Sequence, residues 1–322
     1  MTSPGPLPDE SAAQAVLTPG RVEVMRPRDV PLGGPRAMRV RRTLPQRQRS
    51  LVGAWCFLDH YGPDDVSETG GMQLPPHPHI GLQTVSWLFE GELEHRDSAG
   101  NHVRVRPGEL NLMTSGPGIS HTEDSVSDTG VLHGAQLWVA LPADSLDAEP
   151  RLDHYAPPPV RGPGWEARVF LGSVFGHTSP VATHTPLLGA ELMLATGATK
   201  VVEVDAGFEH AVLLDVGRVT VDGTDIGPGD LAYLPPGRHT IAVSATEEAR
   251  VLLIGGPPFG EAIVMWWNFV GRSHDEVARA REDWQEQLDG DRVRDGRFGV
   301  VPHPLPPIPA PPMPHVRLKE RR

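Results

Sequence analysis

Short hydrophobic runs separated by turns follow one another along most of this chain. Residues 82–89 (LQTVSWLF) are rich in β-branched and aromatic side chains. Residues 102–106 alternate, with Val103 and Val105 on one face, which is typical of a strand with one buried side. Similar runs lie at residues 54–58, 110–114 and 136–141. Roughly seven such strands with regular turns predict a β-sandwich or small barrel for the first half of the chain.

A second series of strands begins after a stretch rich in proline and glycine. PPP at residues 157–159 and GPG at residues 162–164 mark a linker, and further hydrophobic runs extend from residue 167 to residue 254. Residues 215–222 (DVGRVTVD) and the PGD turn at 228–230 repeat the order found at residues 89–106 and in the PGE turn at 107–109. This repetition predicts an internal duplication.

One helix and two irregular ends complete the predicted elements. Residues 275–288 (DEVARAREDWQEQL) predict a helix, because acidic residues lie in its first turn and Gly290 lies just beyond its end. Residues 1–20 have no periodicity and predict a disordered leader. The proline-dense residues 301–322 predict a loose tail, either in extended polyproline segments or disordered.

Two pairs of alternating residues carry the strongest chemical signal. His77 and His79 are separated by one residue, and so are His121 and Glu123. In a strand, side chains at i and i+2 point to the same face, so each pair directs two metal-capable groups one way. Two such strands side by side would gather three imidazoles and one carboxylate. That set suits one divalent transition metal (Fe, Mn, Co, Ni, Cu or Zn) and leaves positions open for water or a substrate.

The overall composition narrows the classes of function. The net charge of −12 argues against a nucleic-acid binder, because phosphate backbones need basic surfaces. Cys56 is the single cysteine, so no intramolecular disulfide can form, and we expect it to pack as a small apolar residue. The sequence shows neither a secretory signal nor an apolar run long enough to span a bilayer. We therefore expect a cytoplasmic monomer with no membrane partner and no direct nucleic-acid partner.

Several stretches resemble the pirin family of the cupin superfamily. They are residues 41–45 (RRTLP), 57–60 (FLDH), 77–81 (HPHIG), 116–123 (GPGISHTE), 136–142 (QLWVALP), 255–258 (GGPP) and 264–269 (VMWWNF). The resemblance implies an all-β bicupin, with two tandem jelly-roll β-barrels and a short C-terminal helix. It also implies that iron is the usual metal, bound in the first barrel by His77, His79, His121 and Glu123. The expected parts are a leader (1–20), a metal-binding cupin domain (21–155), a metal-free cupin domain (165–272), a helix (273–290) and a tail (291–322).

The resemblance also sets expectations for residues around the ligands. Cupins often have a Glu four residues after the second His, where this chain has Gln83, so we expect Gln83 near the metal. Asp59 and His60 match the family motif, and we expect them in a structural or pocket-rim role. His210 and His239 belong to no HxH or HxE pair, so we expect that the second barrel has lost its metal.

Two kinds of function are implied. As an enzyme, the chain would be a metal-dependent dioxygenase similar to quercetinases, which cleave a ring of a flavonol, and Glu123 would take the proton of the substrate's hydroxyl group. The alternative is a non-enzymatic, redox-sensitive regulator that binds a transcription factor or a metabolic enzyme. The expected partner is a small planar aromatic substrate in the first case and a protein in the second.

Overall fold

The first unit of the structure is a pair of β-sheets, one of seven strands and one of four. The computed structural model describes residues 20–31, 38–126, 129–290 and 296–322. The larger sheet has the order β12 (Arg151–Tyr155), β9 (Leu110–Thr114), β6 (Leu82–Glu90), β11 (Val131–Ala140), β4 (Trp55–Asp65), β3 (Arg39–Leu44) and β2 (Arg28–Pro31). The smaller sheet has the order β5 (Gln73–His79), β10 (Ile119–Ser125), β7 (Leu93–Asp97) and β8 (His102–Val105). Short helical turns lie at α1 (Val66–Thr69) and η1 (Ala143–Ser145).

The second unit repeats this arrangement. Its larger sheet has the order β1 (Glu23–Met25), β22 (Leu231–Leu234), β19 (Glu209–Val216), β24 (Ala249–Gly256), β17 (Leu188–Leu194), β14 (Trp165–Leu171) and β13 (Val160–Gly162). Its smaller sheet has the order β18 (Thr199–Glu203), β23 (Thr240–Ala245), β20 (Val219–Val221) and β21 (Thr224–Ile226). Two hairpins form separate two-stranded sheets. They are β15 (Ser173–Val174) with β16 (His177–Thr178), and β25 (Val264–Trp266) with β26 (Phe269–Gly271). The matching strand orders support the internal duplication, and the all-β bicupin prediction is confirmed.

The edge strand of the second unit comes from the beginning of the chain. β1 pairs antiparallel with β22, with Met25 opposite Leu231. The N-terminal segment therefore extends the sheet of the second unit, although the sequence placed residues 21–155 together in the first domain. The predicted leader falls on residues 1–19, outside the described part, except for Gly20.

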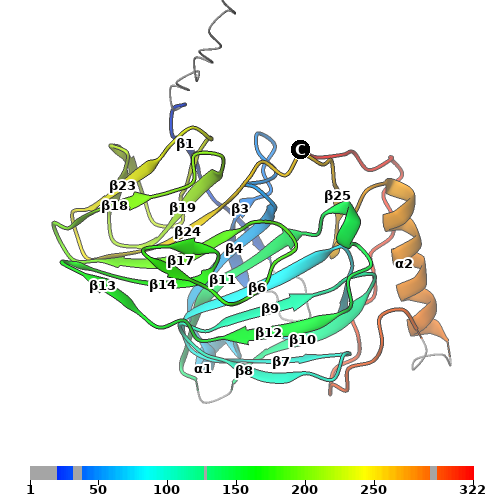
Figure 1. Cartoon of the computed structure of the whole chain (residues 1–322). Coiled ribbons are helices and arrows are strands. Elements are labelled where there is room, and N and C mark those ends of the chain that lie inside the picture. The colour runs from blue at the N-terminus through cyan, green and yellow to red at the C-terminus, as the bar shows by residue number, and fades with distance from the viewer. Residues whose placement is uncertain (1–19, 32–37, 127–128, 291–295) are drawn as a thin grey trace, which may run out of the picture.

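The two seven-stranded sheets pack against each other and form the largest shared core. Leu58 and Trp87 from the first unit lie in one buried cluster with Leu213 and Ile254 from the second. Separate clusters fill the space between the two sheets within each unit. Figure 1 shows the strands of the second unit at the left, layered on those of the first unit. Both faces of the central strands β6 and β11 of the first unit are therefore buried.

Neighbouring residues of β4 alternate between the core shared by the two units and the interior of the first unit. Leu58 packs in the core between the units, whereas Phe57 lies among residues that line a cavity in the first unit. The same alternation sends His60 towards the second unit and Asp59 towards the cavity side.

Helix α2 (His274–Asp289) covers the side of the first unit, as Figure 1 shows. Ser273 caps it by accepting a hydrogen bond from the backbone N–H of Glu276. Val277, Ala280 and Trp284 form its buried face. The helix predicted at residues 275–288 is therefore confirmed. No helix in the described ranges is both long and apolar enough to cross a bilayer.

The C-terminal segment is held in place, which corrects the prediction of a loose tail. The backbone N–H of Ile308 donates to the carbonyl of Pro76, and Trp284 Nε1 donates to the carbonyl of Ile308 at 2.9 Å. Further on, the backbone of Arg321 pairs with that of Ile263. The segment has no helix or ladder of its own, so its order comes from contacts with distant parts of the chain.

Candidate metal centre

Three histidines predicted as ligands converge between strands β5 and β10. The strands pair antiparallel, with His121 opposite His77 and Ile119 opposite His79. One ring nitrogen from each of the three histidines lies within 4.8 Å of those of the other two, and all three side chains are buried. The strand alternation on which the prediction rested is therefore present in the structure.

The spacing of these nitrogens fits a shared metal ion. His79 Nε2 and His121 Nε2 are 3.1 Å apart. Metal–nitrogen bonds of about 2.0–2.1 Å place neighbouring ligand nitrogens roughly 2.8–3.4 Å apart across octahedral and tetrahedral geometry. The donor set and the spacing thus fit a divalent transition metal.

Backbone carbonyls orient two of the rings. His77 Nδ1 lies 2.9 Å from the carbonyl oxygen of Pro75, and His79 Nδ1 lies 3.0 Å from that of Asn268. A carbonyl oxygen only accepts, so each Nδ1 carries the proton and each Nε2 keeps its lone pair for a metal. Asn268 lies in the β25–β26 loop of the second half of the chain, so both halves build the site.

Burial keeps these imidazoles neutral. It lowers the pKa of His77 from 6.5 to about 4, and it holds the pKa of His79 and that of His121 well below the ordinary value. Three neutral rings can bind a cation at pH 7 without first losing protons.

Glu123 lies beside His121, away from the centre of the histidine group. One of its oxygens lies within 4.8 Å of nitrogens of His121 and His95, but the four predicted ligands do not form one group at that distance. Its Oε1 accepts a hydrogen bond from Ser86 at 2.9 Å. Burial raises the pKa of the Glu123 carboxyl. The prediction that Glu123 is a metal ligand stays a prediction.

His95 and Asp97 on β7 complete this polar surface, and the sequence analysis missed them. Asp97 accepts from His95 Nε2 at 3.3 Å, so in the neutral ring Nδ1 of His95 is an acceptor. It lies 3.4 Å from His121 Nδ1, which leaves His121 Nε2 facing the other histidines. The alternation of His95 and Asp97 within residues 93–97 (LEHRD) is the signal that could have revealed the pair.

A cavity of about 290 Å³ opens beside the three histidines. Phe57 and Trp138 form one stacked wall, with ring centroids 4.1 Å apart, and the guanidinium of Arg42 lies 4.4 Å from the Phe57 ring centre. The other lining residues are Pro31, Leu74, Glu123, Gln136, Trp267, Asn268 and Ile308. The cavity therefore combines aromatic surfaces, a few polar groups and a candidate metal site.

Gln83 does not lie in this cavity, which corrects the expectation drawn from other cupins. It shares a face of β6 with Val85 and Trp87, which pack in the core between the units. Its Nε2 donates to Thr114 Oγ1 at 2.9 Å. Ser86, on the opposite face, contacts Glu123 instead.

The second unit lacks a corresponding ligand cluster in the described residues. Strands β18 and β23 take the places of β5 and β10, and they bury Val202, Ile241 and Val243. His210 is buried without a hydrogen-bond partner among the described residues. Cys56 is also buried, which raises the pKa of its thiol to about 12 and makes it a poor nucleophile.

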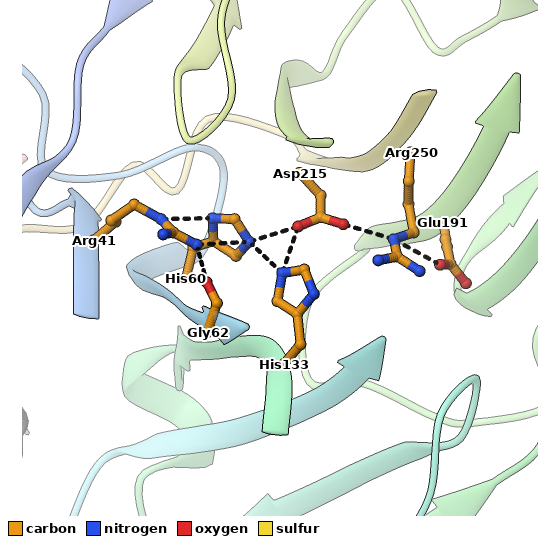
Figure 2. A network of polar contacts seen from close by, with 7 residues as sticks. All are labelled: Arg41, His60, Gly62, His133, Glu191, Asp215 and Arg250. Carbon is orange, nitrogen blue, oxygen red and sulfur yellow. Dashed lines mark hydrogen bonds and ion pairs between the residues drawn. The ribbon is translucent and has the colours of Figure 1, made fainter. Parts of the chain in front are cut away.

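A second cluster of metal-capable groups joins the two units (Figure 2). His60 Nε2 and His133 Nε2 each lie 2.7 Å from Asp215 Oδ1, and Arg250 donates to Asp215 Oδ2 at 2.6 Å. Arg41 Nε donates to His60 Nδ1 at 3.3 Å on the other side of the ring. The two guanidinium groups supply the positive charge that a metal would supply, so the cluster is a hydrogen-bonded link between the units.

Family models and solved structures agree with this architecture. The pirin model matches residues 37–139, and the model of the pirin C-terminal cupin domain matches residues 189–289. A relative from Pseudomonas aeruginosa, named "Putative quercetin 2,3-dioxygenase PA1205", is 45% identical over 84% of this chain and 86% of its own length. A pirin-like protein from Caulobacter vibrioides is 36% identical over 76% of this chain and 88% of its own length. The crystal structure of quercetin 2,3-dioxygenase from Acinetobacter baumannii superposes with a TM-score of 0.85 at 37% identity, covering 92% of this chain and 97% of that one.

Proposed function

The chain belongs to the pirin family, and on that premise we propose that it is a metal-dependent dioxygenase acting on a flavonol or another planar hydroxylated aromatic compound. The observation that carries the proposal is the convergence of three buried, neutral histidines on a cavity with aromatic walls. The similarity to proteins named as quercetin 2,3-dioxygenases supports this substrate class.

Each part of the site has a role in such a reaction. His77, His79 and His121 would hold the metal, with Fe(II) as the first ion to test. The metal would act as a Lewis acid towards a substrate hydroxyl and as a redox centre for oxygen chemistry. The stacked pair of Phe57 and Trp138 would form an aromatic wall beside the substrate.

Glu123 is the residue placed to take the substrate's hydroxyl proton. Its carboxylate lies beside His121 and lines the cavity. Ser86 donates a hydrogen bond to one of its oxygens, which holds the carboxylate in place. A positioned base of this kind contributes roughly 10²–10⁴-fold to a rate.

Metal analysis and oxygen uptake test the proposal. The purified protein is loaded with Fe(II) without oxygen, and oxygen consumption is then measured with quercetin. Luteolin, which lacks the 3-hydroxyl group, is the matched control substrate. We expect near-stoichiometric metal, oxygen uptake with quercetin and little uptake with luteolin. His121→Ala should lose most of the metal and the activity. Stoichiometric metal without quercetin-dependent uptake would refute dioxygenase activity on this flavonol.

A further inference from the structure

Trp267 adopts a backbone conformation that is rare for tryptophan. It is the first of the two residues between β25 and β26, and its φ is +52°. Such two-residue hairpin loops need a positive φ at this position, and glycine meets the need without steric cost. A bulky residue in this region is a genuine outlier, and outliers of this kind gather at ligand sites.

Trp267 lies at the candidate metal cavity. Trp267 lines the same cavity as His77, His79 and His121. Its ring packs edge-to-face against the buried ring of Phe269, with centroids 5.3 Å apart and planes at 87°. Trp267 is only partly buried, and it is one of the residues that line the cavity.

The same loop also orients a candidate ligand. The carbonyl of Asn268, the next residue, accepts from His79 Nδ1 at 3.0 Å. One tight turn thus fixes an aromatic surface and a metal-capable ring relative to each other.

A second aromatic surface in the cavity comes from a different part of the chain. Phe57 on β4 and Trp138 on β11 stack with planes at 13°. Trp138 also packs edge-to-face on His79, with ring centroids 5.3 Å apart. Flat aromatic groups from the first unit and from the β25–β26 loop therefore line one space next to the histidines.

We propose that Trp267 determines specificity by stacking on a planar aromatic substrate and disfavouring puckered ones. The inference rests on the proposed function, because it concerns the substrate class of the same cavity. Stacking on an aromatic side chain is worth about 1–3 kcal/mol per ring, which corresponds to roughly 5- to 150-fold in affinity. A ring with a saturated bond cannot make this contact over its whole area.

Binding measured without oxygen tests the role of Trp267. Quercetin and its 2,3-dihydro analogue taxifolin carry the same hydroxyl groups, but only quercetin is flat throughout. We expect the metal-loaded wild type to bind quercetin more tightly than taxifolin. Trp267→Gly should weaken quercetin binding about 5- to 150-fold and leave taxifolin binding nearly unchanged. Trp267→Phe should keep most of the preference.

A matched control separates stacking from relief of backbone strain. Phe175 also begins a two-residue hairpin loop, with φ of +55°, but it lies in the second unit and does not line the cavity. Phe175→Gly should leave the ratio of the two affinities as in the wild type. Metal content and melting temperature are measured for every variant. An unchanged ratio in Trp267→Gly, or a wild type that does not distinguish the two compounds, would overturn the inference.

The outcomes also separate this inference from the proposed function. A preference for quercetin that depends on Trp267, without oxygen uptake, refutes the dioxygenase and supports the role of Trp267. Oxygen uptake with quercetin, together with an affinity ratio that is the same in the wild type and in Trp267→Gly, supports the dioxygenase and refutes the role of Trp267.

Discussion

Arg42 and Asp59 form an ion pair with two hydrogen bonds at the wall of the cavity. Arg42 Nε lies 2.6 Å from Asp59 Oδ1, and Nη2 lies 2.7 Å from Oδ2. The carboxylate is fully buried, whereas 24% of the Arg42 side chain is exposed. Burial raises the pKa of Asp59, and the hydrogen bonds and charge of Arg42 oppose that rise. Asp59 does not line the cavity itself, but it holds in place the guanidinium of Arg42, which does.

Replacing Asp59 with Asn should loosen Arg42 without changing the shape of the wall. We expect the KM for quercetin to rise several-fold and the metal content to stay unchanged. Stability should fall by about 1–3 kcal/mol, because a buried hydrogen-bonded group loses its partner. Arg42→Lys, which keeps the charge and loses the forked geometry, should raise KM in the same way. Steady-state kinetics and thermal melting check both variants, and an unchanged KM in both would exclude the anchoring role.

His95→Ala should weaken metal binding although His95 is not one of the predicted ligands. The His95 ring links Asp97 to His121 and sets which nitrogen of His121 faces the site. Loss of such a supporting contact typically costs about 10–100-fold in metal affinity. Competition with a chelator measures the change. His102→Ala on β8 is the control, because that side chain is 56% exposed. Equal metal affinities in the two variants would show that the contact of His95 with His121 does not support metal binding.

Alternation predicted the face of each ligand pair, and the resemblance to pirins supplied the pairing of the two strands that gathers the histidines. His77 and His79 are two residues apart, as are His121 and Glu123, and that spacing is visible in the sequence. The contribution of Asn268 could not be predicted, because it lies 189 residues from His79 and reaches it through the packing of a separate hairpin. Local patterns specify faces of strands, and distant contacts depend on how the units pack.

The positions of Gln83 and of the C-terminal tail also depend on distant contacts that local sequence patterns do not predict. The position of Gln83 relative to His79 suggested a place near the metal, but the face of β6 that carries it packs on the second unit. The proline-rich composition of the tail suggested disorder, because composition reports only local tendencies. Its order depends on partners such as Trp284 and Ile263, which the sequence does not identify as its neighbours.

Deleting residues 301–322 should lower the melting temperature of the protein. The deletion leaves the indole N–H of the buried Trp284 without its acceptor and removes Ala310 from a buried cluster. A buried polar group without a partner costs about 1–3 kcal/mol, and each kcal/mol corresponds to roughly 2–4 °C in melting temperature for large domains. Trp284→Phe in the full chain should reproduce part of the loss. An unchanged melting temperature in the deletion variant would restore the prediction of a loose tail.

The link between the units should make stability depend on pH. Burial holds the pKa of His60 below its ordinary value of 6.5, although the hydrogen bond to Asp215 opposes the shift. The unfolded chain therefore takes up a proton at this residue before the folded chain does, and folding is disfavoured increasingly as pH falls below about 6.5. Asp215 has its pKa lowered, because hydrogen bonds from His133 and His60 outweigh its burial, so it stays ionised throughout this range. Between pH 7 and pH 5 the melting temperature of the wild type should fall more steeply than that of His60→Gln. The exposed variant His102→Gln should follow the wild type, and parallel curves for all three proteins would show that the link does not titrate.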